Sequence, residues 1–316
     1  MKLLNLFYSL LSLLLKLSCV MIILFIIYIS LPIKTTQTVT LPKGSITKTI
    51  EHLKKEGYTL TTVDTYILAY LLKQPKSGTL EIGGKNMSRI KFLQKLSSAK
   101  EAIDIVTLIP GETRSIFLKE IAKKQNLDIE KLESFYTKFS SYPEAGIIPD
   151  TYYVAKNISE KRLIKTLTQQ SEKRYKALSI KYLKEYDKKE WLRILTIASV
   201  IQKEAANNKE MPIVASVIYN RLKIDMPLQM DGTLNYGDYS HVKVTPKRIK
   251  TDTSGFNTYA NKGLPPYPVC SVSLPAIEAS LNPKTTDYLY FMKNSDGVHD
   301  FTNSYKAHLE NIDRAK

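Results

Sequence analysis

Apolar residues are most concentrated at the start of the chain, in a run that is long enough to cross a membrane. Residues Leu17–Ile33 carry no charge, and the preceding stretch LFYSLLSLLL adds further apolar positions. A membrane-spanning helix needs roughly 20 apolar residues. Lys16 interrupts the run, but its long side chain can reach the headgroups. We therefore predict one transmembrane helix from about Leu13 to Pro32.

A cleavable signal peptide is the competing interpretation of the same run. Its cleavage site should consist of small residues, and the sequence YISLP at Tyr28–Pro32 offers none. Lipid attachment at Cys19 is disfavoured, because Lys16 occupies a position where an aliphatic residue is needed. Basic residues precede the span, at Lys2 and Lys16, which favours a cytoplasmic N-terminus. We expect residues 1–34 to form a short tail and a retained anchor, with the remaining chain outside the cytoplasm.

Residues 35–105 alternate short strand patterns with short helical patterns, as in a small α+β module. Thr38–Leu41 is typical of a strand, and Ser45 is placed to cap a helix that ends at Gly57. A second helix is predicted near Val63–Lys73. The stretch GTLEIGG then indicates a strand, and a third helix carries apolar residues at helical spacing, namely Ile90, Leu93 and Leu96.

Residues 106–157 contain a second strand–turn–helix pattern. A strand at Ile105–Ile109 leads into Pro110-Gly111, and two helices follow. The pattern V…PGET…IA…N…L resembles a LysM-type module, a class that binds peptidoglycan. An ordinary strand–turn–helix unit needs the same residue types, so both interpretations stay open.

Residues 158–316 are predicted to form the largest domain. Residues 158–189 read as a charged helical connector, and EWLRILTIASVIQKEAA then places apolar residues at i, i+3, i+4 and i+7. Pro212 begins another helix. Proline-rich loops, a short helix at Pro275–Leu281, a hairpin with its turn at Asn294–Gly297 and a terminal helix complete the domain.

Glu204 is the residue of this domain that raises a question of chemistry. It lies on or beside the apolar face of its helix, just before the Asn207-Asn208 turn. A carboxyl group beside the turn between two helices is well placed to face a cleft. Apolar neighbours would disfavour its charged form and keep it protonated near neutral pH. The alternative is an ordinary solvated helix residue, which is the usual fate of glutamate.

Composition narrows the possible functions. The 316 residues include 46 basic and 30 acidic ones, a net charge of +16, but the basic residues are mostly lysines interleaved with acidic ones. This distribution lacks a nucleic-acid-binding signature, so we expect no nucleic-acid partner. The two cysteines and four histidines have no metal-ligand spacing. We therefore expect neither a metal nor another cofactor.

An ordered set of motifs extends over most of the chain after the predicted anchor. PGET and EAGIIPDTYYV are followed by ASVIQKEA, VIYNRL, MPLQMDGTLNYG, FNTYANKGLPP, DYLYFM and HDF…AH. Together they resemble the MltG/YceG-like family of membrane-anchored endolytic murein transglycosylases. The resemblance implies a single-pass protein of the bacterial inner membrane, with its catalytic domain on the periplasmic side. It also implies cleavage of the MurNAc–GlcNAc bond in nascent glycan strands to leave 1,6-anhydroMurNAc ends, which terminates strand elongation.

The resemblance also suggests which residues act. A glutamate in an E-K-E-type motif is catalytic in this family, and Glu204 occupies its position. Three positions depart from the family pattern: Gln202 replaces the first acidic residue, Gly232 stands where proline is usual, and Ser271-Val272-Ser273 replaces Asn-Pro-Gly. The change at Gln202 is harmless if the chemistry needs only the second glutamate, and the other two bear on how the loop fits the substrate, not on the reaction. The resemblance and side-chain chemistry together suggest a set of substrate-binding candidates, namely Gln229, Asp231, Tyr236, Asn257, Tyr259 and Asn220.

Each candidate also has a purely structural interpretation. Asp231 could equally be a turn residue. Tyr236 and Tyr259 could be packed in the core or at its edge, and Asn220 could connect its helix to a loop. Two other functions also remain open. One is a lysozyme-type hydrolase in which Asp231 or Asp252 would handle water, and the other is a non-catalytic peptidoglycan-binding scaffold. A peptidoglycan synthase is a plausible partner in either case, although nothing in the sequence names one.

Overall fold

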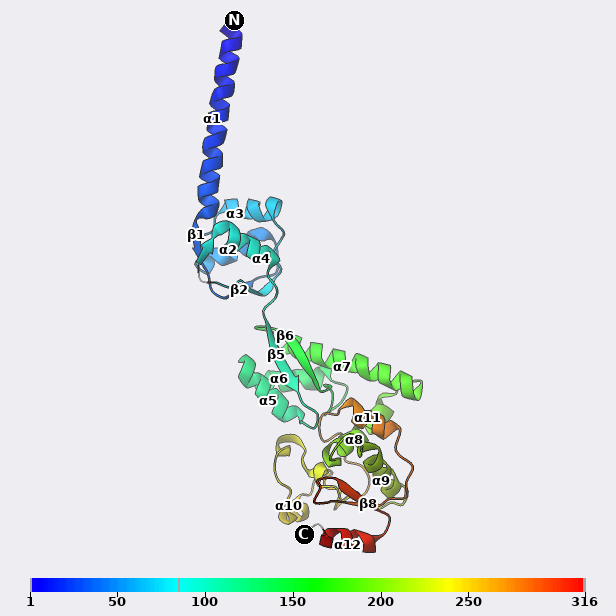
Figure 1. The fold of residues 1–316 in the computed structure, drawn as a ribbon. Helices are drawn as coiled ribbons and strands as arrows, with labels where there is room; N and C mark the ends of the chain where they lie inside the picture. The colour runs from blue at the N-terminus through cyan, green and yellow to red at the C-terminus, as the bar shows by residue number, and fades with distance from the viewer. Residues whose placement is uncertain (1, 85, 315–316) are drawn as a thin grey trace. The chain divides into compact units, whose positions relative to one another are not determined.

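A computed structural model describes residues 2–84 and 86–314. The chain forms two compact units, one of residues 1–104 with 153–157 and one of residues 105–152 with 158–316. Both combine helices with two-stranded sheets, which confirms a mixed α+β fold (Figure 1).

The first unit begins with one long apolar helix. Helix α1 (Lys2–Ser30) starts well before the predicted Leu13, because no glycine or proline interrupts the leucine-rich residues before it. Its stretch Leu4–Ser30 is long and apolar enough to cross a membrane. Residues 4–27 are exposed, and Tyr28 and Ile29 are partly buried against the module that follows. The predicted apolar N-terminal helix is therefore present.

The rest of the first unit is a small module of short elements. Two antiparallel pairs, β1 with β4 and β2 with β3, pack with helices around a core that includes Leu53, Leu68 and Phe92. Ser45 accepts a hydrogen bond from the Lys48 amide, as expected of the predicted N-cap. The predicted second helix is divided into α3 and a π-helical turn at Ile67–Leu71. The elements are β1 (Pro32–Lys34), β2 (Thr38–Leu41), α2 (Ile46–Lys55), α3 (Thr62–Tyr66), β3 (Gly78–Glu81), β4 (Asn86–Ser88) and α4 (Arg89–Ser98).

Strands β5 and β6 pair with each other and carry the chain between the units. Helices α5 and α6 separate them in the sequence, so that this segment has the order βααβ. The first three of these elements match the predicted strand and two helices, whereas β6, which lies within the motif EAGIIPDTYYV, was not predicted. The bounds are β5 (Ile103–Leu108), α5 (Arg114–Gln125), α6 (Ile129–Phe139) and β6 (Asp150–Ala155).

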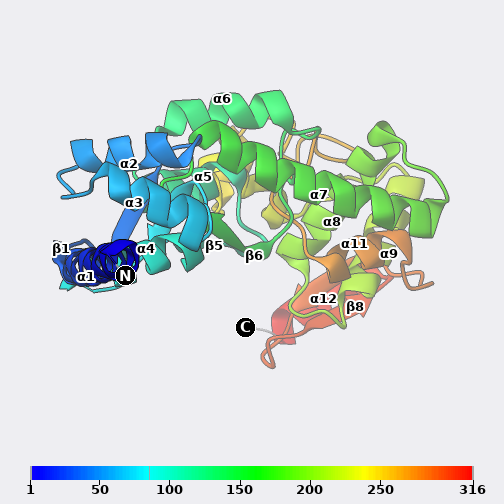
Figure 2. The ribbon, with the colours of Figure 1, turned by 90° about the horizontal axis from the view of Figure 1, so that it is seen from above.

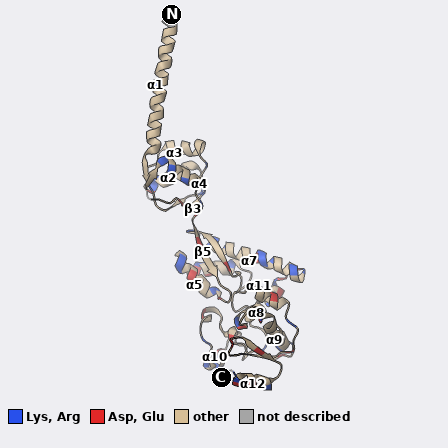
Figure 3. Cartoon of the chain, viewed as in Figure 1, with Lys and Arg blue, Asp and Glu red and all other residues tan. Residues whose placement is uncertain are grey.

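The second unit is built around one buried helix. Helix α8 (Lys188–Glu204) packs against α9 (Met211–Lys223) and α11 (Leu274–Leu281), and its residues Trp191, Leu195 and Ala198 are fully buried. The predicted connector is helix α7 (Glu160–Leu183), along which Lys and Arg are frequent (Figure 3). Figure 2 shows α7 and α8 from above. The remaining elements are α10 (Pro246–Thr251), β7 (Tyr290–Lys293), β8 (His299–Thr302) and α12 (Tyr305–Arg314).

Candidate active site

Glu204 is the last residue of α8. The Asp187 side chain caps the start of this helix by accepting a hydrogen bond from the Glu190 amide, and apolar residues fill the next turns. The helix stops at Glu204 because the backbone of Ala205 is extended. The core therefore holds α8 rigidly, while its final side chain emerges at the edge of that core. A carboxyl group on a fixed helix end is well suited to chemistry that needs accurate placement.

A backbone amide from a distant loop contacts this carboxyl group. The Gly232 amide donates a hydrogen bond to Glu204 Oε1 over 2.7 Å. Gly232 belongs to a 3₁₀ turn at Asp231–Leu234. A Cβ atom at position 232 would lie 2.7 Å from Glu204 Oε1 and 2.5 Å from Lys203 Cβ, so the loop can approach this closely because the residue is glycine.

The environment of Glu204 favours its protonated form. Burial above all, with a smaller contribution from the negative charge of Asp231, raises the pKa of the Glu204 carboxyl group to about 7. The hydrogen bond from Gly232 and the positive charge of Arg221 act in the opposite direction but are weaker. Near neutral pH, this carboxyl group is consequently present in both forms, as a group that donates and then accepts a proton requires.

Glu204 opens into a pocket of about 380 Å³. The pocket is formed entirely within the second unit, by the end of α8, helix α9, the loops at 229–231 and 259, the β7–β8 hairpin and helix α12. Its lining combines aromatic, basic and acidic side chains, a mixture suited to a sugar ring with both apolar faces and hydroxyl groups. The lining residues are Glu204, Arg221, Gln229, Asp231, Tyr259, Tyr290, Phe291, Met292, Lys293, His299, Tyr305 and His308.

Three of the predicted substrate-binding residues line this pocket beside Glu204. The Tyr259 hydroxyl donates a hydrogen bond to Asp231 Oδ1 over 2.8 Å, so these two side chains hold each other in place. Gln229 has a left-handed backbone, with a φ of 48°, and its amide bonds to the Thr258 carbonyl. Such a conformation is uncommon for glutamine and is often found at functional sites.

Asn257 and Asn220 do not line the pocket, and their side chains bond to backbone carbonyls. Asn257 is buried and donates to the carbonyl groups of Ile249 and Asp252. Asn220 donates to the carbonyl groups of two residues that precede β7, Thr286 and Tyr288. Both amides therefore organise the loops around the pocket, and Asn220 ties its helix to a loop.

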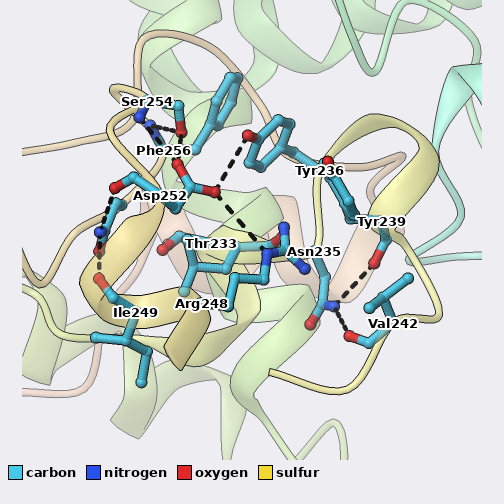
Figure 4. A network of polar contacts seen from close by, with 12 residues as sticks. Thr233, Asn235, Tyr236, Tyr239, Val242, Arg248, Ile249, Asp252, Ser254 and Phe256 are labelled. Carbon is cyan, nitrogen blue, oxygen red and sulfur yellow. Dashed lines mark hydrogen bonds and ion pairs between the residues drawn. The ribbon is translucent and has the colours of Figure 1, made fainter. Parts of the chain in front are cut away.

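Tyr236 also lies outside the pocket lining. Its ring stacks on Phe256, with 4.3 Å between ring centroids, and its hydroxyl donates to Asp252 Oδ2 (Figure 4). One face of the ring is therefore covered by protein. Asp252 is itself engaged by Ser254 and Arg248. Burial opposes ionisation of Asp252, but the hydrogen bonds from Ser254 and Tyr236 and the charge of Arg248 together outweigh it and hold the pKa of Asp252 below its usual range.

Two of the three departures from the family pattern, Gln202 and the 271–273 loop, contact each other. Gln202 Oε1 accepts a hydrogen bond from the Ser273 amide over 3.1 Å, and Ser273 is the N-cap of α11. Ser271 bonds to the backbone of Gly111 and Glu112. An amide at position 202 thus fastens the 271–273 loop to α8, and none of these residues lines the pocket.

Several pocket residues were not among the predicted candidates. His299 is nearly buried, and its Nδ1 lies 2.7 Å from Glu210 Oε2, while its amide donates to Glu210 Oε1. Arg221 binds the carbonyl groups of Leu228 and Leu289. The hairpin pattern was visible in the sequence, but no sequence signal indicated that it faces Glu204. The described residues contain no group of three or more His, Cys, Asp or Glu side chains that could hold a metal ion.

The fold and the site define an α+β protein that has one apolar N-terminal helix and a pocket built around a largely buried carboxylic acid. Residues 39–314 match the YceG-like family, and the chain belongs to that family. This match confirms the resemblance drawn from the motifs.

Characterised relatives and a solved structure agree with this assignment. The chain is 29% identical over 305 residues to the endolytic murein transglycosylase of Bacillus subtilis (strain 168), covering 87% of this chain and 83% of that protein. It is 38% identical over 125 residues to the endolytic murein transglycosylase of Streptococcus pneumoniae serotype 2, covering 38% of this chain and 23% of that protein. A crystal structure of a yceG-like protein from Listeria monocytogenes is 26% identical, with a TM-score of 0.57, and the match covers 88% of this chain and 99% of that one.

Proposed function

We propose that this protein is an endolytic murein transglycosylase and that Glu204 is its catalytic acid and base. One observation carries the proposal: the pocket contains a carboxyl group whose pKa of about 7 permits both protonation states near neutral pH. The relatives in Bacillus subtilis and Streptococcus pneumoniae, which are named for this activity, support the same reaction.

The proposed reaction uses the same carboxyl group twice. Protonated Glu204 donates its proton to the oxygen that links MurNAc to GlcNAc, and the bond between MurNAc C1 and that oxygen breaks through an oxocarbenium-like transition state. The 6-hydroxyl of the same MurNAc attacks C1, and its proton passes to the Glu204 carboxylate. The products are a free GlcNAc hydroxyl and a 1,6-anhydroMurNAc end, and no water is consumed.

The neighbouring residues have supporting roles in this proposal. Burial is the main reason that Glu204 keeps its proton, and the charge of Asp231 adds to it by raising the pKa of Glu204. Gln229, Asp231 and Tyr259 contact sugar hydroxyl and acetamide groups in the pocket. Asn220, Asn257 and Tyr236 act by shaping the surrounding loops, because their side chains already contact protein atoms.

The hydrolase alternative now depends on Asp231. Asp252 does not line the pocket and is held by Ser254 and Arg248, so it is badly placed to activate water. The two reactions differ in their products: transglycosylation leaves anhydro ends, whereas hydrolysis leaves reducing ends that are heavier by one water. A scaffold without activity would bind glycan strands and release neither product.

We further propose how the protein meets its substrate. Helix α1 anchors it in the inner membrane, and the remaining chain lies on the periplasmic side, where nascent strands emerge. Cleavage there would terminate strand elongation, and a peptidoglycan synthase is the plausible neighbour. The βααβ segment from β5 to β6 has the element order expected of a LysM-like module, which supports a role in holding peptidoglycan.

Mass spectrometry of digested glycan strands tests the proposal. The full chain in detergent micelles is incubated with peptidoglycan strands, and anhydro and reducing ends are counted. We expect anhydro ends from the native protein and none from Glu204→Gln. Glu190→Gln is the matched control, because it makes the same change at an exposed position of the same helix. Anhydro ends from Glu204→Gln at the native rate would refute the assignment, and reducing ends from the native protein would establish the hydrolase instead.

A further inference from the structure

The membrane-proximal module has one cluster of exposed apolar side chains. Val63, Tyr66, Tyr70 and Leu71 have exposed fractions of 43%, 58%, 80% and 66%. They come from α3 and the π-helical turn that follows it, and we call them the tyrosine face. Between residues 31 and 102, Leu31 is the other exposed large apolar residue that the structure describes, and it directly follows α1.

The tyrosine face is a continuous surface. Val63, Tyr66 and Tyr70 are spaced by three and four residues, which places them on one side of a helix. The rings of Tyr66 and Tyr70 stack, with 6.2 Å between centroids. Stacked tyrosines left open to water are unusual in a module whose other large apolar residues, apart from Leu31, are buried or partly buried. Tyrosine is enriched at membrane surfaces, since its ring is apolar and its hydroxyl is polar.

Polar contacts fix the start of α3 at the end of α1. The Tyr28 hydroxyl, near the end of α1, bonds to Thr61 Oγ1 over 2.5 Å and to Asp64 Oδ2 over 2.9 Å. Thr61 and Asp64 form the capping box of α3. Arg89 lies over the Tyr28 ring and forms an ion pair with Asp64 over 2.7 Å. Because these side chains are interlocked, α3 is held beside the end of α1, as Figure 1 shows.

The same contacts determine where the membrane surface lies. The stretch Leu4–Ile27 is about 36 Å long at 1.5 Å per residue, which is enough to cross a hydrocarbon layer of about 30 Å. From Tyr28 onward the helix contacts the charged pair Asp64 and Arg89, which is too costly to place in hydrocarbon. The membrane surface therefore lies near Tyr28, at the level where α3 begins.

We propose that the tyrosine face is a second membrane contact, seated among the headgroups of the leaflet from which α1 emerges. Its occupant is a phospholipid bilayer. Lys73 and Lys76, which are both exposed and follow the tyrosine face directly, would favour anionic headgroups. With both α1 and the tyrosine face in contact with the membrane, the orientation of the module relative to the membrane surface is fixed. Anchoring by α1 alone would leave that orientation free to vary. This inference rests on the proposal that α1 spans a membrane.

Tryptophan quenching by labelled lipids tests the contact. The full chain is placed in vesicles of equal parts phosphatidylcholine and phosphatidylglycerol, a fraction of which carries a nitroxide near the top of the acyl chain. Tyr70→Trp reports on the tyrosine face and Phe25→Trp on α1. Tyr153→Trp, at another exposed tyrosine in β6, is the matched control. The single native tryptophan, Trp191, is fully buried and supplies a constant background.

We expect Tyr70→Trp and Phe25→Trp to lose emission in the nitroxide vesicles and Tyr153→Trp to keep it. Quenching of Phe25→Trp alone would overturn the second contact and leave the membrane span intact. If neither is quenched, both the span and the contact are refuted. Equal quenching of Tyr70→Trp and Tyr153→Trp would also overturn the proposal, because the loss would then be unrelated to the tyrosine face.

Discussion

Replacing Glu204 by glutamine should stabilise the protein at alkaline pH while removing its activity. The substitution keeps the size of the side chain and the oxygen that accepts the hydrogen bond from Gly232. It removes the ionisation, and ionisation of this group is unfavourable in the folded protein because burial opposes it. The structure therefore predicts that activity and stability change in opposite directions.

The size of the effect follows from the pKa. The Glu204 carboxyl group titrates at about 7 in the folded protein and at 4.5 as an ordinary glutamate. Below pH 4.5 it is protonated in both folded and unfolded chains and contributes no difference. Between pH 4.5 and pH 7 the unfolded chain loses the Glu204 proton while the folded protein keeps it, so the folded state becomes less stable over this interval and changes little above it. At about 1.4 kcal/mol per pH unit, the native protein loses up to about 3 kcal/mol of unfolding free energy that Glu204→Gln retains.

Thermal unfolding at several pH values measures this difference. Trp191 lies in the same helix as Glu204 and is the single tryptophan, so its fluorescence follows the unfolding of the second unit. We expect equal midpoints for native protein and Glu204→Gln near pH 4.5. At pH 8 the variant should melt roughly 6–12 °C higher, given about 2–4 °C per kcal/mol for a domain of this size.

The exposed control Glu190→Gln should show no such dependence on pH, since its side chain is about half exposed. A difference between native protein and Glu204→Gln that is the same at pH 4.5 and pH 8 would refute the reasoning. It would mean that the Glu204 carboxyl group is as well solvated in the fold as in the unfolded chain, and it would remove the physical basis for a shared acid and base.

Two further predictions concern the reaction. The rate of anhydro-end formation should fall about tenfold per pH unit above pH 7, because only protonated Glu204 can donate to the leaving oxygen; a pH–rate profile that stays flat to pH 9 would contradict this role. Gly232→Ala should lower kcat on the order of 10²-fold, because the new methyl group displaces the Glu204 carboxyl group from its position. Single-turnover measurements check this expectation, and a native rate in a folded Gly232→Ala protein would count against it.

Much of the fold could be predicted from local patterns. The apolar stripe of α8 and the Pro212 start of α9 were visible because amphipathic helices repeat every three to four residues. The π-helical turn at Ile67–Leu71 could not be foreseen, since the sequence there fits an α-helix equally well. Strand β6 was missed although Tyr152 and Val154 are buried at alternate positions, because the strand is short and directly follows a loop-like stretch in the same motif.

The site was predictable only in part, for a different reason. Glu204 stood out because it ends an apolar helix at a turn. The hydrogen-bond partners of the polar side chains, however, are often backbone groups of segments that lie far away in the sequence and come close only in the folded protein. The Asn257 side chain donates hydrogen bonds to the carbonyl groups of Ile249 and Asp252. The spacing of residues in the sequence gives no sign of this pairing. His299 enters the pocket from a hairpin far along the chain for the same reason.

The pocket has a consequence for the timing of activity. Much of its lining comes from residues 290–308, whereas α1 is made at the very start of synthesis. Under the proposed anchoring by α1, a growing chain would be fixed in the membrane long before the pocket is complete. Cleavage of glycan strands would then begin only after the last part of the chain has been made, when the β7–β8 hairpin and α12 complete the pocket around Glu204.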